Sequence, residues 1–298
     1  MQNNKKQGSL LKPKVNAFDI INYIALTIFG LLCLFPMLYE LVLSVASKGD
    51  FMRAKLFVIP REFHIEAYRF IFGKQNIGQA FLISVFLTVV TTLYSLVITS
   101  FGAFAFSRKN VPGLKVFFTL IIITMFFSGG IIPFYLTVEK LLGINNLWCL
   151  IIPFGTNTFN MIILRNFFLQ VPESILESCR IEGASEFRIL FQFVLPLSKA
   201  GIATVMLWLI VGNWDAWYWP SFFLRQRTDL YPLALALRNA LMALDGNSYE
   251  GKPLDGSKLF AQGNNAAMIM VSITPILCIY PFFQKYFVKG VMVGSVKE

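Results

Sequence analysis

The sequence predicts an all-α protein whose helices cross a lipid bilayer six times. Apolar residues occupy 56% of the 298 positions and charged residues only 14%, whereas soluble domains average about 45–50% and about 25%. The hydrocarbon core of a bilayer is about 30 Å thick and is spanned by about 20 helical residues. Six windows of at least that length hold at most one charged residue each: 20–39, 75–107, 116–138, 141–164, 200–224 and 259–284.

A large soluble helical protein is the alternative explanation for such windows. Core helices of soluble proteins normally keep a polar face, with apolar residues repeating at a period of 3.6. These windows are apolar all round, so we expect their backbone groups to be satisfied inside helices that face lipid. The first window is too long for the apolar region of a secretory signal peptide, and we expect it to be a retained first span.

Basic residues indicate the orientation. Cytoplasmic flanks of membrane proteins are enriched in Lys and Arg, and the N-terminal tail 1–18 and the short turn 108–115 both fit that pattern. We therefore expect both termini in the cytoplasm, a six-span domain over 19–290, outer loops at 46–77 and 225–262, and a cytoplasmic tail at 291–298. The net charge of +10 then reflects flanks that face anionic lipid, and no nucleic-acid partner is expected.

Catalytic and nucleotide-binding motifs are weak in this sequence. The single histidine, His64, is too little for a His-rich metal site or a Ser-His-Asp triad. The stretch 246–253 imitates a phosphate-binding loop, but Pro253 stands where the loop requires Ser or Thr. Only Asp215 places an acid well inside a window, which is thin support for ion coupling. The sequence therefore predicts a transporter subunit rather than an enzyme, and a gradient-driven transporter remains an alternative.

The stretch 171–198, between the fourth and fifth windows, predicts two short helices joined by a glycine. Gly183 can adopt the left-handed conformation that ends a helix, and Ser185 can cap the next one. The first helix carries Glu173, Glu177 and Arg180 on one face. Pro196 is expected to stop the second helix.

This loop resembles the coupling loop of ABC importer permeases, whose signature is E-A-A-x-x-D-G-A followed later by I-x-x-P-L. The sequence reads E-S-C-R-I-E-G-A over 177–184 and F-V-L-P-L over 193–197. The Glu, Gly, Ala and Pro-Leu positions match. Ser178 and Cys179 replace the small alanines, Glu182 replaces the aspartate, and Phe193 replaces the isoleucine with a bulkier side chain.

Other stretches refine the resemblance. G-G-I-I-P at 129–133, G-N-W-D-A-W at 212–217 and the segment 286–297 are similar to the carbohydrate branch of the superfamily. Within that branch, the chain resembles permeases for complex-carbohydrate fragments in the cell membrane of Gram-positive bacteria. An importer of the same superfamily for a non-sugar solute is the alternative.

The resemblance implies the type I importer fold. Two six-span permeases would pair as a heterodimer above two ATP-binding cassette ATPases, and an extracellular solute-binding lipoprotein would deliver a sugar or oligosaccharide. ATP and magnesium would bind to the ATPases, so no cofactor is expected in this chain. The ATPase-coupling residues that the motif implies are Glu177, Arg180, Glu182, Gly183, Ala184 and Pro196.

An aromatic cluster in the fifth window is the candidate substrate path. Sugars present apolar C–H faces and many hydroxyl groups, which flat aromatic rings, amides and carboxylates can bind. The residues expected to line the path are Asn213, Trp214, Asp215 and Trp217. The alternative is an interfacial belt or simple packing, because Trp and Tyr also gather at membrane surfaces.

Overall fold

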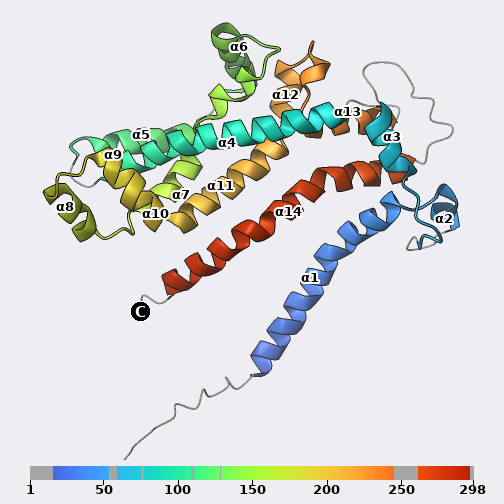
Figure 1. Cartoon of the computed structure of the whole chain (residues 1–298), viewed down its shortest axis with the longest axis horizontal. Coiled ribbons are helices and arrows are strands. Elements are labelled where there is room, and N and C mark those ends of the chain that lie inside the picture. Colours follow the sequence, from blue (N-terminus) through green and yellow to red (C-terminus); the bar gives the residue numbers. More distant parts are fainter. Residues whose placement is uncertain are drawn as a thin grey trace, which may run out of the picture.

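The computed structural model describes residues 16–53, 59–74, 77–108, 111–127, 129–244 and 261–295 (Figure 1). Every regular element within these ranges is a helix. The helices of the main body are α4 (Ile77–Ser107), α5 (Leu114–Phe126), α7 (Thr158–Phe168), α11 (Lys199–Trp214) and α14 (Ala261–Ser295), and α1 (Ala17–Ser44) lies beside them. Shorter helices form its ends and flank: α2 (Lys48–Arg53), α3 (Glu66–Lys74), α6 (Ile131–Leu142), α8 (Glu173–Ile181), α9 (Glu186–Ile189), α10 (Leu195–Leu197), α12 (Tyr218–Phe223) and α13 (Leu233–Leu244).

Helix α4 is the central element. It packs against α7, α11 and α13, and α11 packs in turn against α14. Helix α1 lies outside this body and pairs with α14, which runs in the opposite direction. The short helices α8, α9 and α10 cover one end of the body, while α2 and α3 lie at the other (Figure 1).

The buried face of α4 is polar and its exposed face is apolar. Its buried positions include Ser84, Thr88, Thr91, Thr92, Ser95, Thr99, Ser100 and Ser107. By contrast, Leu82 is 68% exposed and Leu93 is 54% exposed. Small hydroxyl side chains let membrane helices approach closely, whereas in water the exposed Leu side chains would be unfavourable. The arrangement is that of a helix in a lipid environment.

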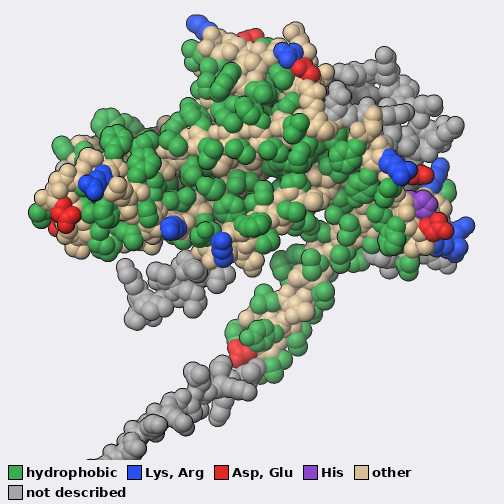
Figure 2. All heavy atoms as spheres, in the orientation of Figure 1, with side chains coloured by type: hydrophobic (Ala, Val, Ile, Leu, Met, Phe, Trp, Pro, Cys, Tyr) green, Lys and Arg blue, Asp and Glu red, His purple; other side chains and the backbone are tan. Residues whose placement is uncertain are grey.

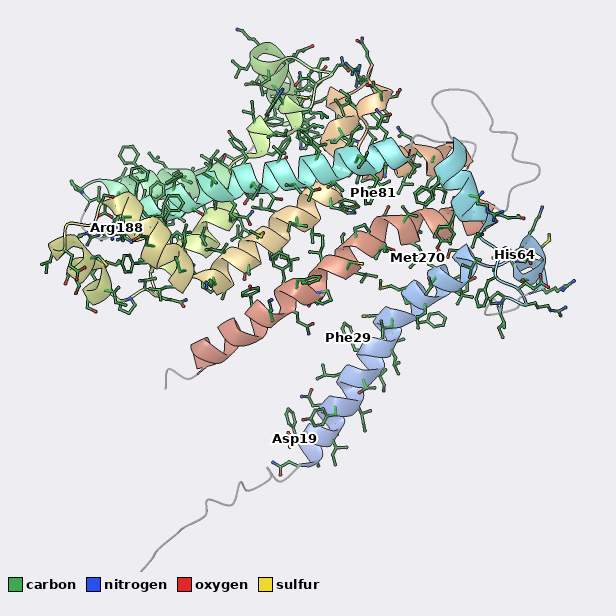
Figure 3. The ribbon with its side chains drawn as sticks, in the orientation of Figure 1. Asp19, Phe29, His64, Phe81, Arg188 and Met270 are labelled. Atoms are coloured by element: carbon green, nitrogen blue, oxygen red, sulfur yellow. The ribbon has the colours of Figure 1, made fainter. Side chains whose placement is uncertain are left out.

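Apolar side chains also cover most of the outer surface. On α1, Ile21 is 67% exposed and Leu32 is 67% exposed. Figure 2 shows hydrophobic side chains along the length of the body, with charged ones mainly toward its ends and on the projection formed by α6 and α12. His64 lies at one of these ends and Arg188 at the other (Figure 3). This distribution matches the belt that a bilayer requires.

Some of the predicted windows form one unbroken helix, and others form helices that are bent or interrupted. Three described helices are long and apolar enough to cross a membrane unbroken: Ala17–Ser44, Ile77–Ser107 and Gln262–Tyr286. Two further candidates are bent pairs, Leu114–Phe126 with Ile131–Leu142 and Glu186–Leu197 with Lys199–Trp214. Length and composition thus indicate three to five candidate spans.

The window 141–164 does not form one continuous helix. It contains the 3₁₀ turns η1 (Trp148–Leu150) and η2 (Ile152–Phe154) and then enters the 11-residue α7. Pro153 cannot donate a backbone hydrogen bond, and the side chain of Asn157 accepts one from the N–H of Asn160, which starts a new helix there. Local turn chemistry therefore overrides the apolar composition.

Pro196 lies near the end of the helical run Glu186–Leu197, which contains a π-helical turn over Leu190–Val194. The run continues for one residue past Pro196. The chain changes direction at Ser198, with φ −102° and ψ 27°, and the helices on either side meet at 85°. The stretch 246–253 that imitates a phosphate loop lies outside the described residues, as do 1–15 and 296–298.

Candidate functional site

The end of α8 is a closed turn built on Gly183. Its φ of +81° lies in the left-handed region, which glycine adopts without a steric penalty. The N–H of Gly183 donates to the carbonyl of Arg180 at 3.0 Å, and the N–H of Ala184 donates to that of Cys179 at 2.9 Å. These bonds satisfy the last carbonyls of the helix, and they confirm the prediction for Gly183.

Helix α9 begins at the predicted cap. The hydroxyl oxygen of Ser185 accepts a hydrogen bond from the backbone N–H of Arg188 at 3.3 Å. The side chain of Arg188 then donates to Gln192 at 2.9 Å, one turn along. The turn between α8 and α9 is therefore held by bonds on both of its sides.

Arg180 joins the two short helices. Its guanidinium lies 3.3 Å from a carboxylate oxygen of Glu173 in α8 and 2.9 Å from one of Glu186 in α9. The hydrogen bonds that Arg180 donates, first to Glu186 and then to Glu173, raise the pKa of Arg180 above its ordinary value. Glu177, on the predicted charged face, is exposed and makes no ion pair within the described ranges.

The underside of this two-helix element is buried against the body. Leu176 of α8 is 1% exposed and Ile189 of α9 is 0% exposed. They belong to one core cluster with residues of α4, α7 and α11: Ala103, Phe104, Leu164, Phe168, Val205 and Leu209. Movement of the short helices would therefore be transmitted to three long ones through packed side chains.

The outer side of the element is open. Ile181 is 87% exposed. Phe187 is 67% exposed, although its ring meets that of Phe101 of α4 edge-on, with the ring centroids 6.0 Å apart. A Cβ atom added at Gly183 would meet nothing within 4 Å. Exposed apolar side chains beside charged ones, at the end of the molecule, are typical of a protein contact surface. We call residues 173–197 the coupling cap.

A second candidate site lies where α11 gives way to α12. The helix ends at Trp214, Asp215 caps it, and α12 starts at Tyr218. A cavity of about 250 Å³ opens at this break. Its lining combines aromatic rings with an amide and a carboxylate: Leu87, Thr91, Leu150, Phe154, Gly212, Asn213, Asp215, Ala216, Trp217, Tyr218, Trp219, Pro220 and Pro232. We call it the aromatic cavity.

Three of the four predicted path residues line this cavity: Asn213, Asp215 and Trp217. The amide of Asn213 donates to the hydroxyl of Thr92 at 3.2 Å, which ties the cavity wall to α4. The indole of Trp217 stacks under the guanidinium of Arg238 at 3.7 Å. Arg238 lines a neighbouring cavity of about 210 Å³ that shares Asp215 and Trp217.

Trp214 lies mainly in the packing. It is 6% exposed and lines the neighbouring cavity but not the aromatic one. Its indole N–H donates to the carbonyl of Ser272 in α14 at 2.9 Å. Its ring meets that of Phe81 in α4 edge-on at 5.7 Å; Phe81 is labelled on α4 in Figure 3.

Known proteins match nearly the full length of the chain. It is 36% identical over 285 residues to the polygalacturonan/rhamnogalacturonan transport system permease protein YtcP of Bacillus subtilis. The aligned region covers 95% of this chain and 99% of YtcP. The chain belongs to the family of ABC carbohydrate-transport permeases. No family model matches it.

Two further matches place the permease in the same family. It is 28% identical over 283 residues to the arabinooligosaccharides transport system permease protein AraQ of Bacillus subtilis, covering 92% of this chain and 95% of that protein. A solved structure of a bacterial ABC transporter involved in import of the acidic polysaccharide alginate matches with a TM-score of 0.82 and 29% identity, over 93% of this chain and 100% of that one.

The permease is accordingly a multi-pass protein of the cell membrane and a transporter subunit, not an enzyme. The resemblance that the sequence showed over 177–184 is confirmed at the level of the family. The apolar outer surface of α1 and α4 agrees with this location.

Sequence reasoning missed Arg108 as part of the cap. With Glu173, Arg180 and Glu186, it lines a cavity of about 490 Å³ between the end of α4 and the coupling cap. Its guanidinium stacks on Phe104 at 4.2 Å, and its Nε and Nη1 atoms are buried without a hydrogen-bond partner. Burial lowers the pKa of Arg108, and the charge of Glu186 partly opposes this. The only sequence signal was a basic residue directly after the second window.

Proposed function

We propose that this permease forms half of the pathway of an ATP-driven importer that moves a sugar or oligosaccharide into the cell. The observation that carries the proposal is the coupling cap, which is internally closed, buried beneath and open at its tip. Such an element suits force transfer, because a packed joint moves as a body between discrete arrangements. Family membership supplies the class of transporter.

The proposal includes the partners expected of this class. A second six-span permease would complete the pathway as a heterodimer, two ATPase subunits would dock on the coupling caps, and an extracellular solute-binding lipoprotein would deliver the substrate. ATP and magnesium would bind to the ATPases. Relatives described as components of transport systems support this assignment.

We further propose that the chain crosses the membrane six times, with both termini in the cytoplasm. The antiparallel course of α1 and α14 supports this, because it brings the start of α1 and the end of α14 to the side on which the coupling cap lies (Figure 1). The bent pair Leu114–Phe126 and Ile131–Leu142 would make the third passage, and α11, which follows the coupling cap, would make the fifth. The broken stretch 141–168 would make the fourth.

In the coupling cap, Gly183 and Ala184 would form the tip that enters a groove of the ATPase. Glu177 and Glu182 would present charge beside it, and both are exposed. Arg180 would keep α8 and α9 at a fixed angle through its two ion pairs. Pro196, next to the bend at Ser198, would help to set the direction in which the cap pulls on α11.

The aromatic cavity would contribute to the substrate path. Trp217 offers a ring face, and Asn213 and Asp215 offer hydrogen-bonding groups for hydroxyls. Trp214 would support this wall from behind through its bond to Ser272. The relatives are described as transporting several kinds of saccharide, which supports sugars as the class over a non-sugar solute.

Substitutions at Gly183 test the docking role. Asn tolerates left-handed backbone conformations, so Gly183→Asn should retain the turn while adding bulk at the tip. We expect it to weaken co-purification of the ATPase by about tenfold, and Gly183→Asp, which also adds charge, to weaken it further. Uptake should fall in parallel while the yield of permease in the membrane stays near normal.

Gly113→Asn is the matched control. Gly113 also has a positive φ, +78°, and its nearest contact is Phe117 at 3.9 Å, but it lies outside the coupling cap. This variant should bind the ATPase normally. Normal ATPase binding and uptake in both Gly183 variants would refute the docking role.

A further inference from the structure

The lining of the aromatic cavity carries a single kind of charge. Among its residues, Asp215 is the one with a carboxylate, and neither Lys nor Arg belongs to the lining that the structure describes. The remaining polar groups are neutral hydroxyls and amides, such as those of Thr91 and Asn213. A ligand in this cavity would meet a negative charge without a compensating positive one.

The carboxylate of Asp215 is also free within the described part of the chain. Its residue is exposed, and its side chain makes no ion pair or hydrogen bond there, although its backbone N–H donates to Val211 at 3.1 Å. By contrast, the exposed acid Asp229 is held by Arg227 at 2.8 Å. A free carboxylate retains its capacity to accept hydrogen bonds from a ligand and its full repulsion of an anion.

The nearby cation is directed elsewhere. Arg238 lies over the ring of Trp217 at 3.7 Å and lines the neighbouring cavity, not the aromatic one. Its contact with the indole occupies a ring face, so Trp217 separates the guanidinium from part of the aromatic lining. Arg238 therefore does not turn the aromatic cavity into an anion site.

The size and the walls of the cavity suit one sugar ring. Its volume is about 250 Å³, which lies just below the usual range of small-molecule pockets, about 300–1,000 Å³. Trp217, Tyr218 and Trp219 supply ring faces for apolar C–H surfaces. Hydroxyl groups of a sugar could donate to the free carboxylate of Asp215.

From this lining we propose that Asp215 is a specificity-determining residue that selects uncharged sugar units and rejects uronates at this point of the path. The inference rests on the proposed sugar transport, and it specifies that the transported sugar is uncharged. A like charge placed against a ligand costs binding free energy and so discriminates against that ligand. A uronate differs from its parent sugar only in carrying a carboxylate at C6, so the two probe this one property.

The test uses the whole importer, purified from native membranes through a tag on this chain and reconstituted in proteoliposomes. Uptake is measured for two matched pairs of probes: galactotriose with trigalacturonate, and mannotriose with trimannuronate. Asp215→Asn removes the charge and keeps the size. We expect the ratio of uronate to neutral uptake to rise by about tenfold in this variant. The unaltered importer and the Asp215→Asn variant use the same binding protein. Any preference of that protein for one probe therefore affects both uptake ratios equally.

Glu139→Gln is the control, since Glu139 is exposed on α6 outside the cavity, and its uptake ratio should match that of the unaltered importer. A preference of the unaltered importer for uronates, or an unchanged ratio in Asp215→Asn, would overturn the inference and leave sugar transport intact. Failure of the unaltered importer to take up any of the four probes would overturn both.

Discussion

The coupling cap and the aromatic cavity are built in opposite ways. In the cap, the turn at Gly183 closes its own backbone bonds, Arg180 holds two acids, and the underside is filled. At the break between α11 and α12, by contrast, two cavities remain and the carboxylate of Asp215 is unpaired in the described structure. The coupling cap also borders a cavity of about 490 Å³ toward α4, so the contrast lies in the polar groups and not in empty volume. In the part proposed to transmit force, Arg180 and its two acids are paired with one another, whereas in the part proposed to bind a carboxylate is left available to a ligand.

The two regions also differ in the range of their contacts. Bonds in the cap join residues at most a few positions apart, such as Ala184 with Cys179 and Arg180 with Glu186. Around the break they join distant helices: Asn213 bonds to Thr92 and Trp214 to Ser272. The cap can therefore hold its shape while it moves, and the break can change shape when α4, α11 and α14 shift.

Replacing Trp214 should have the largest effect on stability. Trp214→Ala removes a buried ring and its bond to Ser272, and such truncations cost about 3–5 kcal/mol. Thermal unfolding of the permease in nanodiscs measures the loss. Trp217→Ala, at a half-buried ring that lines both cavities, should destabilise much less and reduce uptake instead. Equal stability of the two variants would contradict the division between packing and lining.

Gly201 tests the packing of α11 on α7, the two body helices that flank the coupling cap in the sequence. A Cβ atom there would lie 2.7 Å from the Cβ of Phe167 in α7, so Gly201→Ala forces α11 away from α7. Overpacking of this kind costs about 1–3 kcal/mol. Gly212→Ala is the control on the same helix, because a Cβ at Gly212 meets nothing within 4 Å, and it should be neutral or slightly stabilising. A lower melting temperature in the Gly201 variant alone is the expected result.

Arg180→Met should have the smallest effect on stability. It removes both ion pairs of the cap, which are partly exposed, so we expect a loss of about 1 kcal/mol together with a lower ratio of uptake to ATP hydrolysis. Because the pKa of Arg180 is raised, the stabilisation from its ion pairs is fully present below the ordinary pKa of Arg. It is lost only when the pH rises through the raised pKa. Uptake coupling should therefore be flat between about pH 6 and pH 9 as far as Arg180 is concerned.

Arg227→Met provides the comparison for that variant. Arg227 pairs with Asp229 on the surface, where the two side chains are 50% and 46% exposed. We expect no measurable change in the melting temperature or in coupling. If Arg227→Met uncoupled transport as strongly as Arg180→Met, the cap would have no special role for its ion pairs.

The sequence was sufficient where the physics is local. Gly183 and Ser185 could be assigned because a left-handed turn and a helix cap each involve residues only a few positions apart. The partner of Arg180 in α9 could not, since Glu186 comes within reach only after the turn at Gly183 has formed. Arg108 was missed because it approaches the cap through the packing of α4, which no spacing in the sequence encodes.

Apolar composition predicted membrane-spanning segments but not their continuity. The window 141–164 contains Pro153 and Asn157, whose turn and capping chemistry a hydropathy average ignores. Likewise, Trp214 and Trp217 have similar surroundings in the sequence. Their separation into packing and lining depends on where α11 ends, and the backbone sets that at Asp215.

The hydroxyl-lined inner face of α4 has a consequence for how such a chain can evolve or be redesigned. Its most exposed apolar side chains, such as Leu82 and Leu93, face a fluid solvent, so they can be exchanged for other apolar residues at little cost. Its Ser and Thr positions set the distance between helices, so replacement by anything larger would push α7 or α11 away. Sequence drift in this helix should therefore be freest among the largest residues and most restricted among the smallest, the reverse of the pattern in a water-soluble core.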